Sequence, residues 1–287
     1  MRRRVLHVTE APGWGIYSLL VEFTREQTVR GDDVHILAPA SMRRLADVSH
    51  HDWSVQRNKP QTFPGGLRDL RRTVAELRPD VVHLHSFFGG FFGRLPLLSG
   101  LRGTPTVYQP HAWAFNVVEL AKAKTAIELW ERSAGRRTDV MVANCIEEVD
   151  EGRQAGAAAA GIPLGIALDT DRFAPVDAEE RARARAELGL GADGVLLCLG
   201  RQAKQKGQDQ LVSAWESAPI GGAQLVLVGI DDPAELAALA PTQWDKTVRA
   251  VASVTDVRPW LHACDLLVMP SRYEGSAVTV PEALATG

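Results

Sequence analysis

The sequence is poor in cysteine and has no long apolar segment. Its 287 residues include three cysteines, Cys145, Cys198 and Cys264, which lie far apart and form no CxxC pair. This spacing excludes a disulfide framework and indicates a reducing compartment. No run of 18 apolar residues could cross a membrane, and no long apolar region follows the basic residues 2–4 to make a secretory signal. We therefore expect a cytoplasmic protein.

An excess of positive charge is also missing. The chain has 32 lysines and arginines against 35 acidic residues, a net charge of -3. Dedicated nucleic-acid-binding proteins are usually basic, so we expect no nucleic-acid partner. With 45% hydrophobic and 23% charged residues, the composition is that of an ordinary globular protein. The length allows two domains that each bury a core.

Short apolar segments alternate with helical patterns along the first half of the chain. The pattern predicts strands at residues 4–8, 33–37, 81–84, 106–108 and 140–143, and helices over 16–23, 67–77 and 119–132. Near-continuous apolar strands separated by helices favour a parallel sheet that is covered on both faces.

The same alternation restarts after an irregular stretch at residues 154–175. There the pattern predicts strands at 195–199, 224–228, 247–251 and 265–269, and helices over 177–188, 209–215, 257–263 and 278–285. We therefore predict an α/β protein of two Rossmann-like, parallel-sheet domains, residues 1–168 and 169–287. The chain ends directly after a predicted helix, so we expect the second domain to be incomplete.

In open parallel sheets, ligands bind at the carboxyl ends of the strands. Gly13 and Gly15 follow the first strand at the start of a helix, where backbone N–H groups can bind phosphate; the alternative is a plain tight turn. A dinucleotide fingerprint would need a third glycine at Ser18 and an acidic residue after the second strand, where residues 37–39 read Leu-Ala-Pro. We therefore expect no nicotinamide cofactor.

Two histidines lie at the end of the third predicted strand, one within it and one directly after it. His83 and His85 are two residues apart and so point to the same face. A zinc site would need further ligands such as His50 and His51, and no acidic or cysteine ligand stands nearby at metal spacing. We predict that backbone groups satisfy these strand-end histidines and that there is no metal site. The residues that follow are expected to be packing residues: Phe87, Phe88, Phe91 and Phe92.

Three further candidates follow other strands. The imidazole of His111 can donate from one ring nitrogen and accept at the other, which suits a sugar hydroxyl, although a structural role fits its position equally well. Arg201 and Lys206 follow a strand of the second half, with Gly207 beside the lysine. An arginine fork and a lysine point charge could together neutralise a diphosphate without a metal; alternatively, they belong to a solvated loop.

The last segment places Glu274 after a strand and Glu282 eight residues further on. Gly275, Ser276 and Ala277 would supply the open N–H groups of a helix start, which form a second anion site. The two carboxylates are expected to lie on the order of 10 Å apart, so that each could bind the hydroxyls of a different sugar. The alternative for Glu282 is an exposed position on the helix.

Taken together, these motifs resemble the retaining glycosyltransferase family 4, whose members have the GT-B fold of two Rossmann-like domains facing a cleft. The most specific stretch is VRPWLHACDLLVMPSRYEGSAVTVPEALATG, with two glutamates separated by seven residues, and LGRQAKQKG and LVLVG also match. The first half matches more weakly through APGWG, VVHLHS, YQPHAW and DTDRFAP. The family continues beyond the point where this chain stops.

The resemblance implies a role for each candidate residue of the second domain. Arg201 and Lys206 would hold the diphosphate of the donor. Glu274 would contact the transferred sugar, and Glu282 would bind the ribose of the nucleotide. The backbone N–H groups that assist Glu274 would come from Gly275, Ser276 and Ala277.

For the first domain, the resemblance implies that His111 touches the donor sugar near the leaving bond. Gly13 and Gly15 would close on the donor or the acceptor. The implied reaction moves a hexose-type sugar from a nucleoside diphosphate donor to an acceptor that the sequence does not identify. It proceeds with retention of configuration by front-face attack, without a metal or other cofactor, and the cations and the helix start stabilise the leaving diphosphate.

Two other functions stay open from the sequence. One is a nucleotide-sugar-binding protein without turnover, and the other is a sugar-nucleotide epimerase on the same architecture. Three tryptophans of the first half, Trp14, Trp53 and Trp113, suggest an apolar surface for the acceptor. The basic residues 2–4 suggest a weak peripheral contact with a membrane.

Overall fold

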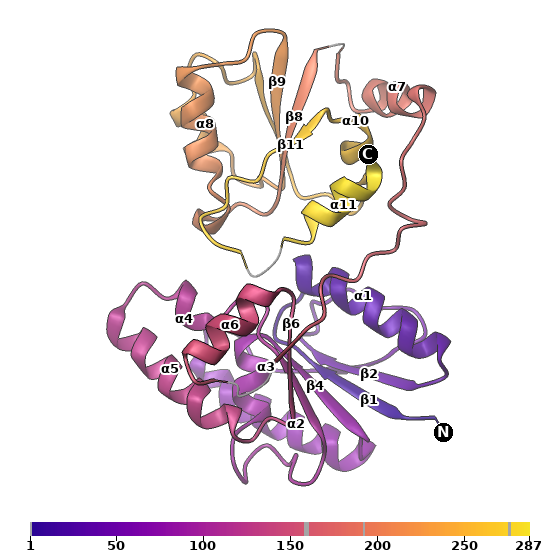
Figure 1. Cartoon of the computed structure of the whole chain (residues 1–287), viewed down its shortest axis with the longest axis vertical. Helices are drawn as coiled ribbons and strands as arrows, with labels where there is room; N and C mark the ends of the chain where they lie inside the picture. Colours follow the sequence, from indigo (N-terminus) through magenta and orange to yellow (C-terminus); the bar gives the residue numbers. More distant parts are fainter. Residues whose placement is uncertain (1, 158–160, 192, 275–276) are drawn as a thin grey trace. The chain divides into compact units, whose positions relative to one another are not determined.

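Two parallel sheets, one in each of two compact units, form the framework of the protein (Figure 1). The computed structural model describes residues 2–157, 161–191, 193–274 and 277–287. Unit 1 comprises Met1–Ala167, and unit 2 comprises Leu168–Gly287. The predicted α/β class with parallel sheets is confirmed.

The sheet of unit 1 has seven strands in the order β3-β2-β1-β4-β5-β6-β7 among the described residues, and all neighbours are parallel. The strands are β1 Arg4–Val8, β2 Asp33–Ala38, β3 Ser49–Asp52, β4 Val81–His85, β5 Thr106–Gln109, β6 Val140–Ala143 and β7 Gly161–Pro163. The sequence did not predict β3 and β7, which lie at the two edges of the sheet and lack an apolar run.

Helices cover both faces of this sheet, as the apolar strands predict. Leu37 of β2 packs into the same cluster as Leu70, while its neighbour Ile36 packs with Leu20 in another cluster. Because successive strand residues point to opposite faces, the helices carrying Leu70 and Leu20 lie on opposite faces. The helices of unit 1 are α1 Trp14–Val29, η1 Pro60–Thr62, α2 Phe63–Leu77, α3 Ser86–Gly93, α4 Ala114–Val117, α5 Ala121–Gly135 and α6 Ile146–Gln154.

The sheet of unit 2 has the order β10-β9-β8-β11 and is also parallel. Its strands are β8 Gly194–Leu199, β9 Ala223–Val228, β10 Val248–Val251 and β11 Leu266–Leu267. The edge strand β11 is shorter than the predicted 265–269. The helices of unit 2 are α7 Ala178–Glu187, η2 Lys204–Lys206, α8 Gln208–Ser217, α9 Ala234–Leu239, α10 Arg258–Ala263 and α11 Thr279–Thr286.

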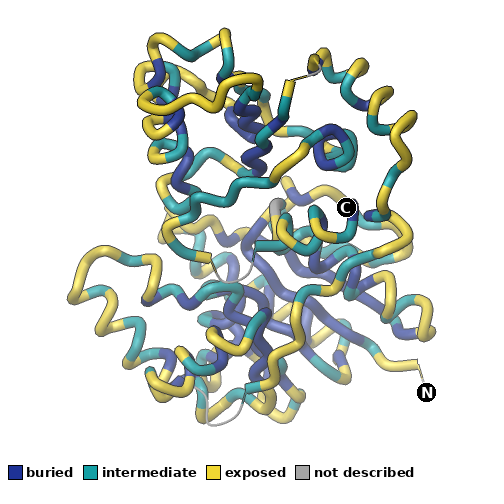
Figure 2. Tube along the Cα trace, turned by 45° about the horizontal axis from the view of Figure 1, so that its top comes forward, coloured by how far each residue is buried: buried dark blue, intermediate teal, exposed yellow. Residues whose placement is uncertain are grey.

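Burial follows the layered arrangement in each unit. Figure 2 shows the central strands buried and many outer turns of the helices exposed. In unit 2, Leu197 packs with Trp260 of α10 on one face, while Cys198 packs with Trp215 of α8 on the other. None of the described helices is long and apolar enough to span a membrane.

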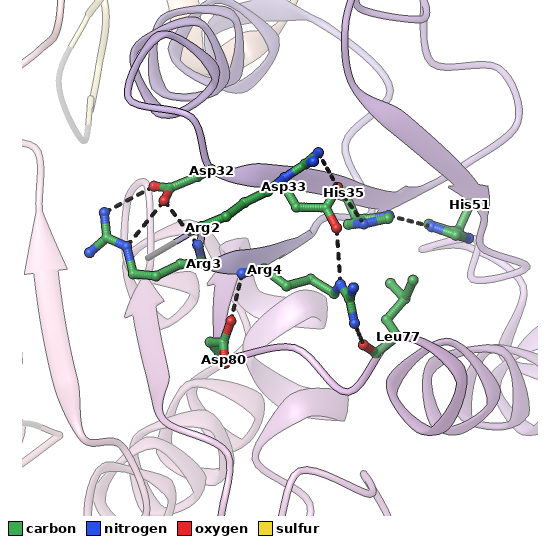
Figure 3. Close-up of polar contacts among 9 residues, drawn as sticks. All are labelled: Arg2, Arg3, Arg4, Asp32, Asp33, His35, His51, Leu77 and Asp80. Carbon is green, nitrogen blue, oxygen red and sulfur yellow. Dashed lines mark hydrogen bonds and ion pairs between the residues drawn. The ribbon is translucent and has the colours of Figure 1, made fainter.

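The arginines at the start of the chain are paired with carboxylates. Arg3 forms a two-point contact with Asp32, and Arg4 donates from Nε to Asp33 at 3.0 Å (Figure 3). Arg2 also reaches Asp33, at 3.4 Å. These pairs join the beginnings of β1 and β2, so they lie at the amino ends of the strands, opposite the carboxyl ends. Each positive charge expected to meet a membrane therefore has an acidic partner within the unit.

Candidate functional site

In unit 2, the segment after β8 is folded tightly against the segment after β11. Gly207 ends η2 with a φ of 68°, and a Cβ atom there would lie 2.1 Å from the carbonyl oxygen of Pro270. Glycine is required because it alone combines this left-handed backbone with such a close approach. The buried side chain of Gln208 donates to the carbonyls of Gly200 and Arg201 at 3.1 and 3.0 Å, which fixes the turn that carries Arg201.

This folding brings three predicted site residues together. Lys206 Nζ lies 2.7 Å from Glu274 Oε1, and both side chains are mostly shielded from solvent, at 18% and 23% exposed. Gln205 accepts from Arg201 Nη2 at 3.0 Å through Oε1 and donates from Nε2 to the carbonyl of Tyr273 at 3.1 Å. Its Nε2 also lies 3.4 Å from Glu274 Oε2. The sequence reasoning missed Gln205, although its place between the two cations is a usable signal.

Glu282 occupies a different environment within the same unit. It stands in the first turn of α11, is 8% exposed, and its carboxylate has no hydrogen-bond partner among the described residues. Burial raises the pKa of Glu282 to about 7, against a smaller lowering by Arg172. The alternative of an exposed helix position is therefore wrong.

The start of α11 differs from the sequence prediction. The helix begins at Thr279, so Ala277 precedes it, and the Ala277 carbonyl accepts from the Val280 N–H at 3.1 Å. Gly275 and Ser276 lie outside the described residues. The helix therefore begins one residue later than the predicted 278–285, and the role expected of the N–H groups of residues 275–277 stays a prediction.

In unit 1, the turns after β4 and β5 have strained backbones. Ser86, His111 and Ala112 adopt positive φ values of 61°, 53° and 81°. Residues other than glycine rarely adopt such a backbone conformation. Glu148 of α6 supports this conformation, since its carboxylate accepts from the N–H groups of Ala112 at 2.5 Å and Asn144 at 2.8 Å. Backbone strain of this kind is characteristic of functional sites.

His111 is half-buried and is hydrogen-bonded to another histidine. Its Nε2 lies 2.9 Å from Nδ1 of His85, whose Nε2 lies 2.9 Å from Nδ1 of His7. The chain continues from His7 Nε2 to Oε1 of Gln27 on α1 at 2.8 Å. The prediction that backbone groups satisfy the strand-end histidines is wrong for His85, because the parallel register places His7 of β1 beside β4. It is also wrong for His83, whose Nε2 is buried with no hydrogen-bond partner among the described residues.

Burial holds these imidazoles in the neutral state. It lowers the pKa of His111 to about 3 and that of His7 to about 4, and it lowers the pKa of His83 and His85 well below the usual value. At neutral pH, each ring therefore carries a proton on only one of its two nitrogens.

Ring stacking disfavours metal binding by the one histidine cluster that has the spacing for it among the described residues. Donor atoms of His7, His83 and His85 lie within 4.8 Å of one another. However, the rings of His83 and His85 are stacked, with centroids 3.9 Å apart and planes 30° apart. A metal about 2.0–2.1 Å from each nitrogen must lie near both ring planes, and stacked rings direct their lone pairs alongside one another. The zinc alternative with His50 and His51 is wrong, because both residues lie on β3. The strands β2 and β1 separate β3 from β4, which carries His83 and His85.

The predicted glycine turn lies at the amino end of α1. Gly13 is the N-cap residue in an extended conformation, and a Cβ atom there would meet nothing within 4 Å. Neither a side-chain cap nor an acidic residue of the first turn engages the N–H groups of α1. Nearby in sequence, the buried Glu10 binds Arg57 at 2.8 Å and accepts from the Gly89 N–H at 3.2 Å.

Comparison with known proteins assigns the family. The family model "Glycosyltransferase Family 4" matches residues 15–170, and the model "Glycosyl transferases group 1" matches residues 193–287. The chain belongs to glycosyltransferase family 4. The matches cover both units and include every described candidate residue except Gly13.

Curated proteins similar to this chain include bacterial glycosyltransferases. D-inositol 3-phosphate glycosyltransferase 1 of Catenulispora acidiphila is 30% identical over 97% of this chain and 73% of its own length. The D-inositol 3-phosphate glycosyltransferase of Streptomyces avermitilis is 28% identical over 92% of this chain. The chain spans 62% of the length of that Streptomyces relative.

Solved structures of the same architecture confirm the GT-B fold. Anabaena HepE in complex with UDP and glucose aligns with a TM-score of 0.82 and 17% identity, over 99% of this chain and 78% of HepE. Sucrose-phosphate synthase of Thermosynechococcus elongatus aligns with a TM-score of 0.79 and 20% identity, over 100% of this chain and 80% of the synthase.

Proposed function

We propose that this family 4 chain transfers a hexose-type sugar from a nucleoside diphosphate donor to an acceptor, with retention of configuration and without a metal. The observation that carries the proposal is the contact of Lys206 with Glu274, joined to Arg201 through Gln205. A cation pair beside a carboxylate offers one surface for a diphosphate and another for sugar hydroxyls.

The electrostatics of the cluster support this division of roles. Arg201 is exposed and can direct its guanidinium fork onto two phosphate oxygens, while Lys206 supplies a point charge. Negative charge accumulates on the diphosphate as the glycosidic bond breaks, so fixed cations stabilise the transition state more than the bound donor. Glu274, aligned by Lys206, is left to accept from hydroxyls of the transferred sugar.

The other candidates receive complementary roles in the proposal. Glu282, which has no donor of its own among the described residues, accepts from the ribose hydroxyls. His111 contacts the donor sugar near the leaving bond. Gly13 and Gly15 bring the first N–H groups of α1 to the donor or the acceptor, and residues 275–277 contribute backbone N–H groups.

The names of the similar proteins guide the choice of substrates for a test. Two relatives are named as glycosyltransferases that act on D-inositol 3-phosphate, and the HepE structure holds UDP and glucose. UDP-sugars are therefore the first donors, and phosphorylated polyols are the first acceptors, followed by ADP- and GDP-sugars.

Calorimetry with the donor panel and mass spectrometry of the products test the proposal. We expect the Arg201→Ala, Lys206→Ala double variant to bind the donor at least about 100-fold more weakly, because two charge-assisted contacts are lost. The exposed Lys246→Ala is the matched control and should bind normally. Normal donor affinity in the double variant would contradict the diphosphate role.

The products separate the proposed function from its alternatives. Transfer to an acceptor with a retained anomeric configuration supports the transferase. Donor binding without transfer or hydrolysis would instead indicate a nucleotide-sugar-binding protein. Interconversion of donor sugars without an acceptor would indicate an epimerase.

A further inference from the structure

The hydrogen bonds behind His111 form an unbranched chain from the end of β5 to α1. They run from His111 Nε2 to His85 Nδ1 and from His85 Nε2 to His7 Nδ1, each at 2.9 Å. The last bond joins His7 Nε2 to Gln27 Oε1 at 2.8 Å. Both nitrogens of His85 and His7 are used within the chain.

The groups at its two ends set the direction of the chain. Gln27 presents a carbonyl oxygen, so His7 must carry its proton on Nε2 and accept at Nδ1. His85 then carries its proton on Nε2, and the same step assigns the proton of His111 to Nε2. At the other end, Asn144 directs Nδ2 toward His111 Nδ1 at 3.3 Å, which independently requires that nitrogen to be unprotonated.

Stacking holds the central ring in place. His83 lies against His85 with ring centroids 3.9 Å apart, and Phe23 of α1 packs on both rings at 5.7 and 6.3 Å. His85 and His7 are fully buried, at 0% exposure. Rotation of the His85 ring would break both of its hydrogen bonds and disturb this stack, so the ring is held in one orientation.

We propose that His85 is a positioning residue that holds His111 as the Nε2–H tautomer, so that His111 offers a bound ligand an acceptor and no donor. This inference rests on the proposed function, in which His111 contacts the donor sugar. A sugar hydroxyl would donate to His111 Nδ1 and replace the long contact from Asn144. The expectation that His111 both donates to and accepts from the sugar is then limited to acceptance.

Nuclear magnetic resonance of the full chain with ¹⁵N-labelled histidine tests the tautomers directly. Long-range ¹H–¹⁵N correlation distinguishes protonated from unprotonated ring nitrogens. We expect His7, His85 and His111 each to carry the proton on Nε2 at neutral pH. Protonation of His111 on Nδ1 would overturn the proposal. This measurement needs no donor, so failure of every donor to react would contradict the proposed function while the spectrum still decides this inference.

Two conservative variants separate positioning from simple structural support. In His85→Asn, the amide oxygen replaces Nδ1 and still accepts from His111, while the contact with His7 is lost. In His85→Gln, the amide nitrogen replaces Nε2 and still donates to His7, while the contact with His111 is lost. Each variant breaks one buried bond, so their stabilities should be similar.

The kinetics of the variants should differ despite their similar stability. We expect His85→Asn to keep kcat within a few-fold of the wild-type value and to keep the Nε2–H tautomer of His111. We expect His85→Gln to lower kcat by about 10- to 100-fold, with a smaller change in the donor KM, because the acceptor is misplaced. His262→Asn in unit 2 serves as the control. Equal losses of kcat in the two His85 variants would overturn the proposal.

Discussion

At the scale of single residues, two buried glutamates have opposite surroundings. Glu148 receives two backbone N–H groups, whereas the Glu282 carboxylate receives no hydrogen bond from the described residues. A buried carboxylate without donors disfavours its charged form. The pKa of about 7 for Glu282 therefore indicates that folding leaves this acid without the partners that a ligand with paired hydroxyls could supply.

The state of Glu282 makes stability depend on pH. Its folded-state pKa of about 7 lies above the ordinary value of 4.5, so the folded chain binds more protons between these pH values and loses stability as the pH rises through them. At pH 8, we expect Glu282→Gln to have a free energy of unfolding about 2–3 kcal/mol higher than that of the wild type, measured by urea denaturation. Near pH 4.5, the two proteins should differ little. The exposed Glu187→Gln is the control. An equal difference at both pH values would contradict the assignment.

At the scale of elements, the turns at the carboxyl ends of strands decide the local geometry. Glu148, in the first turn of α6, bonds to both the turn after β5 and the end of β6. One side chain thus joins two adjacent strands where His111 and Asn144 face each other. The left-handed backbone at His111 and Ala112 persists because this contact supports it.

Removal of the Glu148 side chain should test this support. We expect Glu148→Ala to lower the free energy of unfolding by about 2–4 kcal/mol, since two backbone N–H groups lose their acceptor. Glu147→Ala changes the neighbouring, exposed residue of the same helical turn and should cost less than about 1 kcal/mol. Denaturation in urea measures both. A similar loss in the two variants would mean that Glu148 acts only on the helix dipole.

The loop between β8 and α8 depends on Gly207 in a comparable way. We expect Gly207→Ala to separate Lys206 from Glu274, because the new Cβ would overlap the Pro270 carbonyl. Donor affinity should fall by about 10-fold or more, and stability should fall as well, through the left-handed φ. Gly221→Ala has open space around it and should bind the donor normally. Calorimetry of both variants would reveal equal affinities if the close approach were unimportant.

At the scale of the whole molecule, each unit has its own core. One buried cluster of unit 1 contains Leu70 and Leu84, while Leu197 and Val212 belong to two clusters of unit 2. The alternation of strands and helices predicted these parallel sheets because apolar periodicity depends on local burial. The strands at 4–8 and 140–143 agree residue for residue with β1 and β6.

Elements without a local apolar signal escaped prediction for a physical reason. The edge strand β3 contains Ser49, His50, His51 and Asp52, which are at most half-buried. Its extended form depends on pairing with β2 rather than on the preferences of its own residues. The same reasoning explains the short β11, which pairs only with β8 among the described residues.

Strand periodicity and the motif around Glu274 are local properties, so they were enough to predict the fold class and most of the candidate site residues. The partners of those residues follow from tertiary contacts instead. Gln205 became part of the cation cluster, and His7 became part of the His111 chain, through contacts between segments far apart in sequence. Such contacts depend on strand order and register, which determine which side chains share a face and which remain buried without a partner.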